Sequence, residues 1–352
     1  MPQTLSRASQ MALELDQVTP PSLTHDIVRW ISQEYHDMNG SSIQTLESPP
    51  TAAEFAQLVH ISRPVVIKGF RIPALKRWTD DYLQTNLQDQ PISVAITPNG
   101  QADAIAAGPG GRLFFVEPFI EKVSIEKFLE QLNAEQDNDN LSASYLRSQN
   151  GNIYSSRFFE LPNDDSSEFG ALREDVPSNI PWVTEALGRN PDAVNLWIGN
   201  SKSITSIHSD PYENIYTVIR GSKHFTLLPP CEGWCLQERM YPHAVYGYTD
   251  NSNDLSVVPS SDTPQVRWSS VINPDLPGSL PPEAHPLHVT LEAGDTLYLP
   301  VGWWHYVQQS GPTTIALNWW YDAEVRGMNW IWLSLLRGSG DVPSGNDETN
   351  TR

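Results

Sequence analysis

The segment TSIHSDPYEN at 205–214 carries residue types that bind metal ions. If this segment is extended, His208 and Asp210 point to one face, because side chains two residues apart in a strand share a face. His305, in LPVGWWHYV, would complete a set of two imidazoles and one carboxylate. Such a set leaves three positions open on an octahedral metal, as a non-haem Fe(II) oxygenase requires. The alternatives are a chance His-x-Asp match and, for His305, a histidine packed between aromatic residues.

A lysine is predicted to face the same interior. The run ENIYTVIRGSKHFTLLPP is typical of a hairpin with its turn at 221–222. In that pairing Lys223 shares a face with Tyr216 and matches the parity of His208. A lysine inside a barrel is costly unless an anion meets it, and a dicarboxylate would supply that anion. The alternative is a turn lysine that points into solvent.

Two further polar residues lie in segments that lead to the predicted pocket. Thr205 precedes His208 by three residues and offers a hydroxyl group near the same mouth. Asn318 lies in the apolar run TTIALNWWY, where a lone amide needs a hydrogen-bond partner. The alternative for Asn318 is a core residue satisfied by backbone groups.

The elements that must position these residues change in character along the chain. From residue 193 onward, short apolar segments alternate with Gly and Pro turns, which favours a β-sandwich or barrel. Before that point, helical spacing of apolar residues predicts helices, and β-branched runs predict strands. The helices are expected at 26–38, 52–60, 78–87 and 124–132, and the strands at 63–70 and 92–100.

We therefore expect a mainly β protein with flanking helices (α+β), in several parts. These are an N-terminal tail at 1–24, an α/β region at 25–192, a core at 193–323 with an insertion at about 231–285, a closing helix at 324–340 and a disordered tail at 341–352.

The composition limits the partners. The 352 residues carry a formal net charge of −20, which repels phosphate backbones, so direct nucleic-acid binding is not expected. The charge favours a basic protein or peptide partner; the alternative is that it only maintains solubility. The 12 Trp residues need burial, which excludes disorder of the whole chain. No apolar run approaches the ~18 residues of a membrane span, so a soluble protein is expected.

The two cysteines, Cys231 and Cys235, exclude a disulfide scaffold. Their C-x-x-x-C spacing lacks a second Cys/His pair of zinc spacing, so two ordinary reduced thiols are expected, with metal binding as the alternative. The N-terminal segment lacks the apolar core of a signal peptide. The expected compartment is the reducing cytosol, with nuclear access as a further expectation.

Several segments together resemble the JmjC-domain 2-oxoglutarate oxygenases, in particular the small hydroxylase branch that includes the asparaginyl hydroxylase of hypoxia signalling. They include RPVVIKG, ISVAITPNGQADA, TSIHSDPYENIYTVIRGSKHFTLLPP and GDTLYLPVGWWHYVQQS. The similarity runs from about residue 60 to 325. It implies a double-stranded β-helix, the jelly-roll cupin core, behind a mixed α/β region. It also implies that His208, Asp210 and His305 bind Fe(II).

The resemblance further implies a site for the cosubstrate 2-oxoglutarate. Lys223 would pair with its far carboxylate. Thr205 and Tyr216 fall where the family places hydroxyl partners, and Asn318 where it places a supporting amide. Tyr154, in GNIYSS, would be a further tyrosine contact.

The implied reaction couples oxidative decarboxylation of 2-oxoglutarate by dioxygen to hydroxylation of a protein side chain. For the most similar relatives, that side chain is a lysine of a GTP-binding protein. An alternative is demethylation of lysine or arginine by the same core chemistry. Family members have also been described as peptidases, but the chain shows no hydrolytic triad. A non-catalytic cupin is the remaining alternative, although all three metal ligands and the lysine are present.

The last helical segment suggests an oligomer. Val325, Met328, Trp332, Leu335 and Leu336 lie near helical spacing. Relatives often dimerise through helices in this region, which implies a homodimer. The alternative is that this stripe packs on its own barrel.

Overall fold

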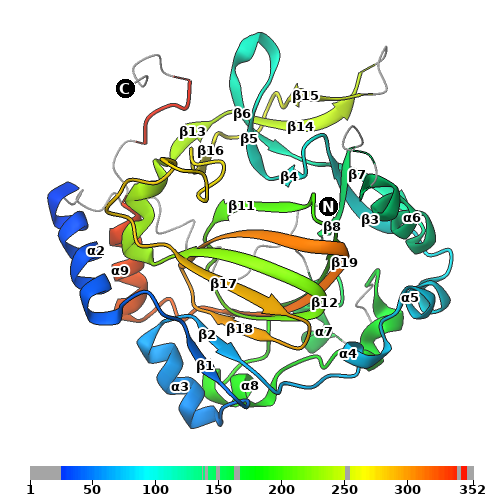
Figure 1. Cartoon of the computed structure of the whole chain (residues 1–352), viewed down its shortest axis with the longest axis horizontal. Coiled ribbons are helices and arrows are strands. Elements are labelled where there is room, and N and C mark those ends of the chain that lie inside the picture. The colour runs from blue at the N-terminus through cyan, green and yellow to red at the C-terminus, as the bar shows by residue number, and fades with distance from the viewer. Residues whose placement is uncertain are drawn as a thin grey trace.

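The computed structural model describes most of the chain (Figure 1). The described residues are 25–136, 138, 142–147, 151–161, 167–249, 254–338 and 342–346. The predicted N-terminal tail at 1–24 lies outside these ranges, and so does the predicted disordered tail at 341–352 apart from 342–346. At 342–346 the prediction of disorder is wrong, because Pro343 and Gly345 exchange backbone hydrogen bonds with Met240.

A curved β core occupies the centre of the molecule (Figure 1). Its strands are β1 (Gln44–Leu46), β2 (Val65–Ile67), β3 (Ile92–Thr97), β4 (Gln101–Ala102), β7 (Phe119–Val123), β8 (Ala143–Arg147), β9 (Tyr154–Ser155), β10 (Ala193–Gly199), β11 (Ile204–His208), β12 (Tyr212–Leu228), β17 (Leu287–Glu292), β18 (Thr296–Leu299) and β19 (Trp304–Asp322). They follow the order β1-β2-β18-β12-β19-β10-β8-β3-β7, with β11 on β19 and β17 on β12. This confirms the expected mainly β core.

The hairpin predicted at 221–222 is wrong. The chain continues through these residues as the single strand β12, which pairs antiparallel with β19 on one side. On its other side, the first half of β12 pairs with β18 and the second half with β17. The long strand β12 therefore joins the two shorter strands β18 and β17 to the same sheet. The sequence signal for a turn, Gly221, instead marks an irregularity with φ of 72°.

Two register shifts between Val218 and Ser222 explain why Lys223 still faces inward. A bulge changes the alternation of side chains along a strand, so residues of opposite parity on its two sides share a face. Phe225, two residues after Lys223, accordingly meets Tyr216 edge to face, with ring centroids 5.2 Å apart. The inward position of Lys223 therefore arises from a bulge and not from a turn.

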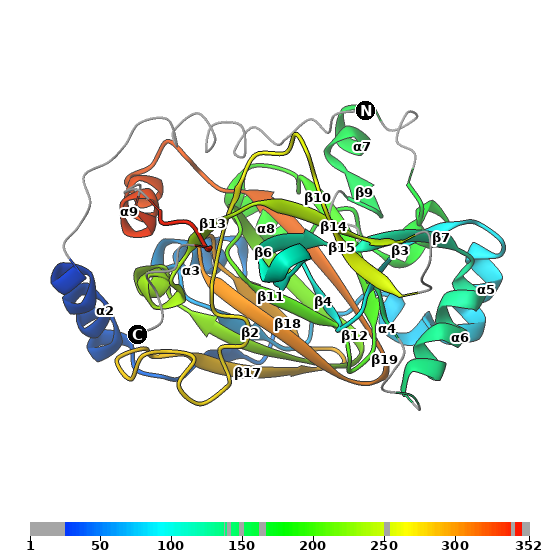
Figure 2. The ribbon, with the colours of Figure 1, turned by 90° about the horizontal axis from the view of Figure 1, so that it is seen from above.

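Helices surround the rim of the core, and all four helices predicted in the N-terminal region are present. The helices are α2 (His25–Asn39), α3 (Ala52–Ile61), α4 (Ala74–Arg77), α5 (Asp80–Leu87), α6 (Ile125–Gln136), α7 (Ser156–Glu160), α8 (Pro181–Leu187) and α9 (Met328–Arg337). Figure 2 shows α2 and α9 on one side of the molecule and α5 and α6 on the other.

Local capping fixes where several helices begin. Thr51 and Glu54 form a reciprocal capping box at α3, and the Thr79 hydroxyl accepts a hydrogen bond from the Tyr82 amide at the start of α5. The closing helix begins at Met328 and not at the predicted residue 324. Gly327 has extended dihedral angles and is its N-cap, so the preceding residues lie outside the helix.

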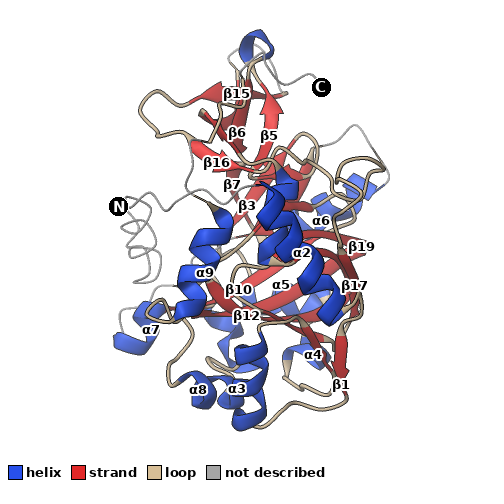
Figure 3. Cartoon of the chain, turned by 90° about the vertical axis from the view of Figure 1, so that its left-hand side faces the viewer, coloured by secondary structure: helices blue, strands red, loops and turns tan. Residues whose placement is uncertain are grey.

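The segment predicted as an insertion lies between β12 and β17 and contains its own elements. They are the 3-10 helix η4 (Pro230–Leu236), β13 (Arg239–Tyr241), β14 (His243–Tyr248), β15 (Leu255–Pro259) and β16 (Val266–Trp268). Strand β14 pairs in parallel with β6 (Leu113–Glu117), which pairs with β5 (Ala104–Ala107). Figure 3 shows this small sheet at the end of the molecule opposite α3 and α8.

The interior of the β core is largely apolar. One buried cluster includes Val218, Phe225, Leu227, Leu297 and Trp303. Burial of such side chains contributes roughly 25 cal/mol per Å² of apolar surface and makes a water-poor interior. Charges in this interior interact strongly and are costly when unpaired.

Two further features concern the cysteines and the lengths of the helices. Cys231 and Cys235 are free, buried thiols, and burial raises the pKa of Cys231 to about 12. Among the described residues, no helix is long and apolar enough to cross a bilayer.

Candidate active site

The three predicted metal ligands converge at one end of the β core. His208, the last residue of β11, lies directly opposite His305, near the start of β19. Asp210 lies in the short connection between β11 and β12, where its carbonyl oxygen accepts a hydrogen bond from the Gly302 amide. One carboxylate oxygen of Asp210 lies 3.6 Å from His208 Nε2, and the other lies 3.6 Å from His305 Nε2. All three ligand atoms lie within 4.8 Å of one another.

The backbone fixes the orientation of both imidazoles. His208 Nδ1 lies 2.8 Å from the Ser206 carbonyl oxygen, and His305 Nδ1 lies 3.0 Å from the Trp303 carbonyl oxygen. A carbonyl oxygen only accepts, so each Nδ1 carries the proton and each Nε2 keeps its lone pair. Both lone pairs are thereby available at the point where Asp210 supplies its oxygens.

The electrostatics of the centre also fit a divalent cation. Burial, and then the neighbouring His208, lower the pKa of His305 to about 4, so its imidazole is neutral at pH 7. Neutral imidazole is the form that binds a metal. Two imidazole nitrogens and one carboxylate form the facial set that suits Fe(II) and leaves positions open for other ligands.

A small pocket adjoins these ligands. Its lining comes from strands β8, β10, β11, β12 and β19 and from the Asp210 connection: Tyr145, Trp197, Thr205, His208, Asp210, Asn214, Tyr216, Phe225, His305, Val307, Asn318 and Trp320. The predicted residues Thr205, Tyr216 and Asn318 therefore all line the pocket of the metal ligands.

Lys223 lies behind this pocket and is only 1% exposed. Its Nζ donates a hydrogen bond of 3.2 Å to the hydroxyl of Tyr145, which lines the pocket, and lies 5.2 Å from the centre of that ring. Burial lowers the pKa of Lys223. None of the described carboxylates forms an ion pair with Lys223. The charge of its ammonium group is therefore not neutralised by any described acidic side chain. Such a group favours an anionic ligand at the adjacent end of the pocket.

Tyr154, predicted as a cosubstrate contact, is not brought to this pocket. Its hydroxyl donates to the carbonyl oxygens of Arg173 and Val176, each at 2.9 Å, and its ring packs beside Phe158. The tyrosine that meets Lys223 is Tyr145, which the sequence analysis missed. Tyr145 enters the pocket through long-range pairing of β8, so no local sequence signal distinguishes it from Tyr154.

Asn318 is part of a small buried polar network. Its amide oxygen accepts a hydrogen bond from the Trp197 indole at 2.7 Å, and its amide nitrogen donates to the side-chain oxygen of Asn214 at 3.2 Å. The expected alternative, a core asparagine satisfied by backbone groups, does not describe these contacts. Asn214 was also missed, although it shares parity with Tyr216 in the extended run after Asp210, and this parity is a usable signal.

The segment between β12 and β17 contributes to the surroundings of the metal ligands. Trp268 of β16 lies parallel to the His208 ring, with ring centroids 6.1 Å apart, and packs on Phe115 of β6 at 4.7 Å. Trp268 belongs to the two-stranded sheet of β13 and β16, and its contact with Phe115 joins that sheet to the small sheet beside His208.

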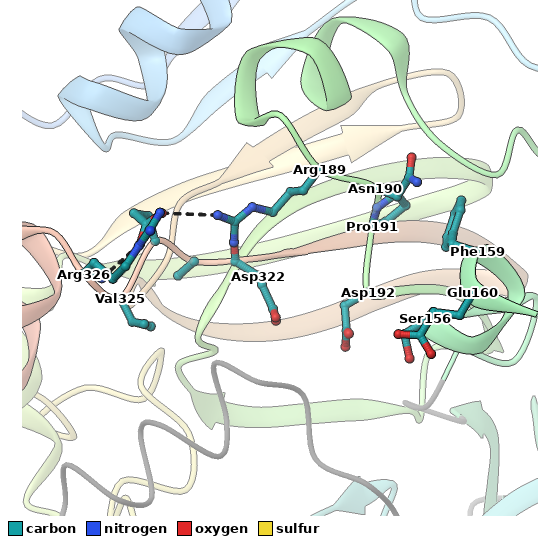
Figure 4. Close-up of a pocket in the computed structure, with 12 residues that line it drawn as sticks. Ser156, Phe159, Glu160, Arg189, Asn190, Pro191, Asp192, Asp322, Val325 and Arg326 are labelled. Atoms are coloured by element: carbon teal, nitrogen blue, oxygen red, sulfur yellow. Dashed lines mark hydrogen bonds and ion pairs between the residues drawn. The ribbon is translucent and has the colours of Figure 1, made fainter.

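A second, larger cavity lies next to this pocket (Figure 4). The Asp192 amide donates to the carbonyl oxygen of Trp320, a residue of the first pocket, at 2.7 Å. Figure 4 shows the carboxylates of Asp192 and Asp322 pointing to the same side of the cavity. Burial, and then the charge of Asp322, raise the pKa of Asp192 to about 6. Arg189 also lines the cavity, and its Nη2 lies 3.3 Å from Oε2 of Glu324.

Comparison with known proteins agrees with the geometry. Residues 51–327 match the family model described as a cupin-like domain, so the chain belongs to this family. Its relatives are JmjC proteins named as a hydroxylase and as demethylases, and the protein is accordingly a JmjC-type 2-oxoglutarate-dependent oxygenase.

Three relatives match over most of their lengths. The chain is 36% identical over 302 residues to "Lysine-specific demethylase JMJ32" of Arabidopsis thaliana, covering 81% of this chain and 83% of that protein. It is 32% identical to "JmjC domain-containing protein E" of Dictyostelium discoideum, covering 89% and 93%. It is 35% identical to "Bifunctional peptidase and (3S)-lysyl hydroxylase JMJD7" of Homo sapiens, covering 80% and 85%.

Proposed function

We propose that this oxygenase is a protein hydroxylase that uses Fe(II) and 2-oxoglutarate to hydroxylate a lysine side chain of a basic protein, such as a GTP-binding protein. The observation that carries the chemistry is the shared pocket of His208, Asp210 and His305, with the buried Lys223 behind it and no described carboxylate paired to that lysine.

In this proposal His208 Nε2, His305 Nε2 and one oxygen of Asp210 hold Fe(II). The iron, when bound, supplies the activation of dioxygen and the oxidation of the substrate C–H bond. The protein fixes the ligand set through the two Nδ1–H bonds to backbone carbonyls. The apolar strands around the pocket exclude water from the reacting groups.

The remaining pocket residues fit the cosubstrate. Lys223 and the hydroxyl groups of Thr205 and Tyr216 receive the far carboxylate, which supplies the missing counter-charge. Asn318, held by the Trp197 indole, supports the end of the cosubstrate nearer the metal. In this arrangement the far carboxylate of the five-carbon cosubstrate lies at Lys223, and its other end lies at the metal.

The choice of a lysine substrate is supported by the name of the human relative, a lysyl hydroxylase. The net charge of −20 and the carboxylates of Asp192 and Asp322 in the neighbouring cavity suit a basic partner. The name of the Arabidopsis relative supports a second candidate, demethylation of a methylated lysine. Both reactions begin with oxidation of a C–H bond, so the pocket serves either.

Mass spectrometry separates the two candidates. The Fe(II)-loaded protein is incubated with 2-oxoglutarate and matched peptides that carry either lysine or methyl-lysine. Gain of one oxygen on unmodified lysine supports hydroxylation. Loss of the methyl group, with unmodified lysine unchanged, would instead mean that the protein is a demethylase. Omission of iron is the control, and it should remove both products.

The proposed homodimer through the C-terminal helix is a separate expectation. In α9, Met328 is 64% exposed and Trp332 is 53% exposed in the single chain. Light scattering of the purified protein, compared with a Trp332→Glu variant, tests whether this face joins two copies. A monomeric wild-type protein at micromolar concentration would contradict it.

A further inference from the structure

Gln309 of β19 is a buried amide that the proposed chemistry does not yet use. Gln309 is only 4% exposed. Neither its amide nitrogen nor its amide oxygen has a hydrogen-bond partner among the described residues. A buried polar group without a partner costs about 1–3 kcal/mol, so such a group in a native interior requires an explanation.

Gln309 lies beside the two groups at the closed end of the cosubstrate pocket. It is the direct cross-strand partner of Lys223 in the pairing of β12 with β19, and partners in register point to the same face. Two residues earlier on the same strand, Val307 lines the pocket, and two residues before that is the metal ligand His305. Along β19 the inward positions therefore run from the metal to the pocket and then to Gln309.

The environment of Gly199 shows where the amide group is held. A Cβ added to Gly199 would lie 2.4 Å from Gln309 Nε2 and 2.8 Å from an atom of the Tyr145 ring. The amide and the ring thus occupy neighbouring space above this glycine. Tyr145 in turn accepts a hydrogen bond from Lys223. The side-chain amide of Gln309 and the hydrogen-bonded pair of Lys223 and Tyr145 therefore lie near one another in the buried interior.

The hydrogen-bonding capacity of this group is not balanced. Lys223 has three N–H donors, of which Tyr145 accepts one. The hydroxyl hydrogen of Tyr145 and the two amide hydrogens of Gln309 add three donors, whereas the amide oxygen of Gln309 adds only one acceptor atom. No described carboxylate is paired with Lys223, so donors exceed acceptors at the closed end of the pocket. An anion with several acceptor oxygens removes this imbalance, and a carboxylate has two.

We propose that the side-chain amide of Gln309 donates a hydrogen bond to the far carboxylate of the cosubstrate, alongside Lys223 and Tyr145. Gln309 is thereby a binding residue that favours a 2-oxo dicarboxylate over a 2-oxo monocarboxylate of equal length. This inference rests on the proposed function, because it requires that 2-oxoglutarate occupies this pocket. The Gln309 amide adds an uncharged donor of defined direction beside the charge of Lys223. Together they select the position of the ligand carboxylate as well as its charge.

Gln309→Met tests the inference, since methionine has a similar length and no polar group. Gln308→Met is the matched control: it makes the same change one residue earlier, where the side chain points to the other face of the sheet. Calorimetry on the Mn(II)-loaded proteins measures the dissociation constants of 2-oxoglutarate and 2-oxopentanoate. The latter has a methyl group in place of the far carboxylate.

We expect Gln309→Met to weaken 2-oxoglutarate binding about ten-fold or more, as for loss of a hydrogen bond to a charged group, and to leave 2-oxopentanoate binding unchanged. Its melting temperature without ligand should equal or exceed that of the wild type, because an unpaired buried amide is removed. Gln309→Glu, which would place a carboxylate beside Lys223, should weaken 2-oxoglutarate binding further. Gln308→Met should change neither constant.

Equal weakening of both ligands by Gln309→Met would mean that Gln309 acts only through the fold, and it would overturn the inference. Unchanged 2-oxoglutarate binding in both Gln309 variants would overturn it as well. In either case wild-type binding of 2-oxoglutarate leaves the proposed function intact. If the wild-type protein does not bind 2-oxoglutarate, the proposed function fails, and this inference fails with it.

Discussion

Glu213 provides a test of the interior electrostatics through stability. It lies on β12, and its side chain is buried. The Oε2 atom of Glu213 accepts two hydrogen bonds, one from the Tyr298 hydroxyl at 2.7 Å and one from the Val301 amide at 3.4 Å. Burial outweighs these two bonds and raises the pKa of Glu213 from 4.5 to about 7. Glu213→Gln removes the ionisation and keeps the size of the side chain.

The sign of the effect follows from proton linkage. The folded protein holds the Glu213 proton more tightly than the unfolded chain does, so its contribution to stability falls as pH rises from about 4.5 to about 7. One pKa unit corresponds to about 1.4 kcal/mol, so the ionised carboxylate costs about 3 kcal/mol of folding free energy above pH 7. We expect Glu213→Gln to be close to neutral at pH 4.5 and stabilising by up to about 3 kcal/mol at pH 8.

Thermal denaturation of both proteins between pH 4.5 and pH 8 measures this difference. The melting temperature of Glu213→Gln should exceed that of the wild type by several degrees at pH 8, with the gap closing towards pH 4.5. Glu185→Gln makes the same substitution at an exposed position of α8 and is the matched control for the buried Glu213. A pH-independent gap for Glu213→Gln, or one that widens towards acid, would refute the reasoning.

Four other substitutions have defined outcomes. His208→Ala should abolish succinate release and metal binding while the melting temperature of the metal-free protein changes little; full activity would mean that the metal site is wrong. Lys223→Met should raise the KM for 2-oxoglutarate about 100-fold, through loss of charge-assisted hydrogen bonds worth about 3 kcal/mol, and an unchanged KM in a succinate-release assay would contradict this. Trp268→Ala removes the ring beside His208 and should weaken metal affinity roughly five-fold, about 1 kcal/mol, in a chelator competition; equal affinity would show that the ring does not support the ligand. Asp175→Asn disrupts a buried carboxylate that accepts hydrogen bonds from Arg77 and an adjacent indole, and should lower stability by about 2 kcal/mol in thermal denaturation, which an unchanged melting temperature would exclude.

The metal ligands could be predicted from residue types and spacing. His208 and Asp210 are two residues apart, although Asp210 lies in the connection after β11, and His305 follows an apolar run and a turn later in the chain. The inward orientation of Lys223 depends on a bulge that could not be predicted from the sequence, because Gly221 is compatible both with a turn and with an irregular strand. Tyr145 could not be separated from Tyr154, since only the pairing of distant strands decides which one reaches the pocket.

The small sheet was also beyond the sequence patterns. It joins β6 and β14, whose residues lie more than 100 positions apart, by parallel pairing. Such pairing depends on closure of a long loop and leaves no periodicity in either segment alone. Trp268 lies on β16, in the separate two-stranded sheet with β13, and packs on the distant Phe115 of β6, so its place beside His208 was missed for a similar reason.

The bulge in β12 restricts which parts of this chain can change in length. A deletion of one residue between Val218 and Ser222 would rotate the second half of the strand by one side-chain step, turning Lys223 outward and His224 inward. By contrast, Leu227 pairs with Leu287 across the base of the segment that follows, so that segment can lengthen or shorten without moving the strands. Insertions and deletions in homologous chains should therefore concentrate after β12 and avoid its middle.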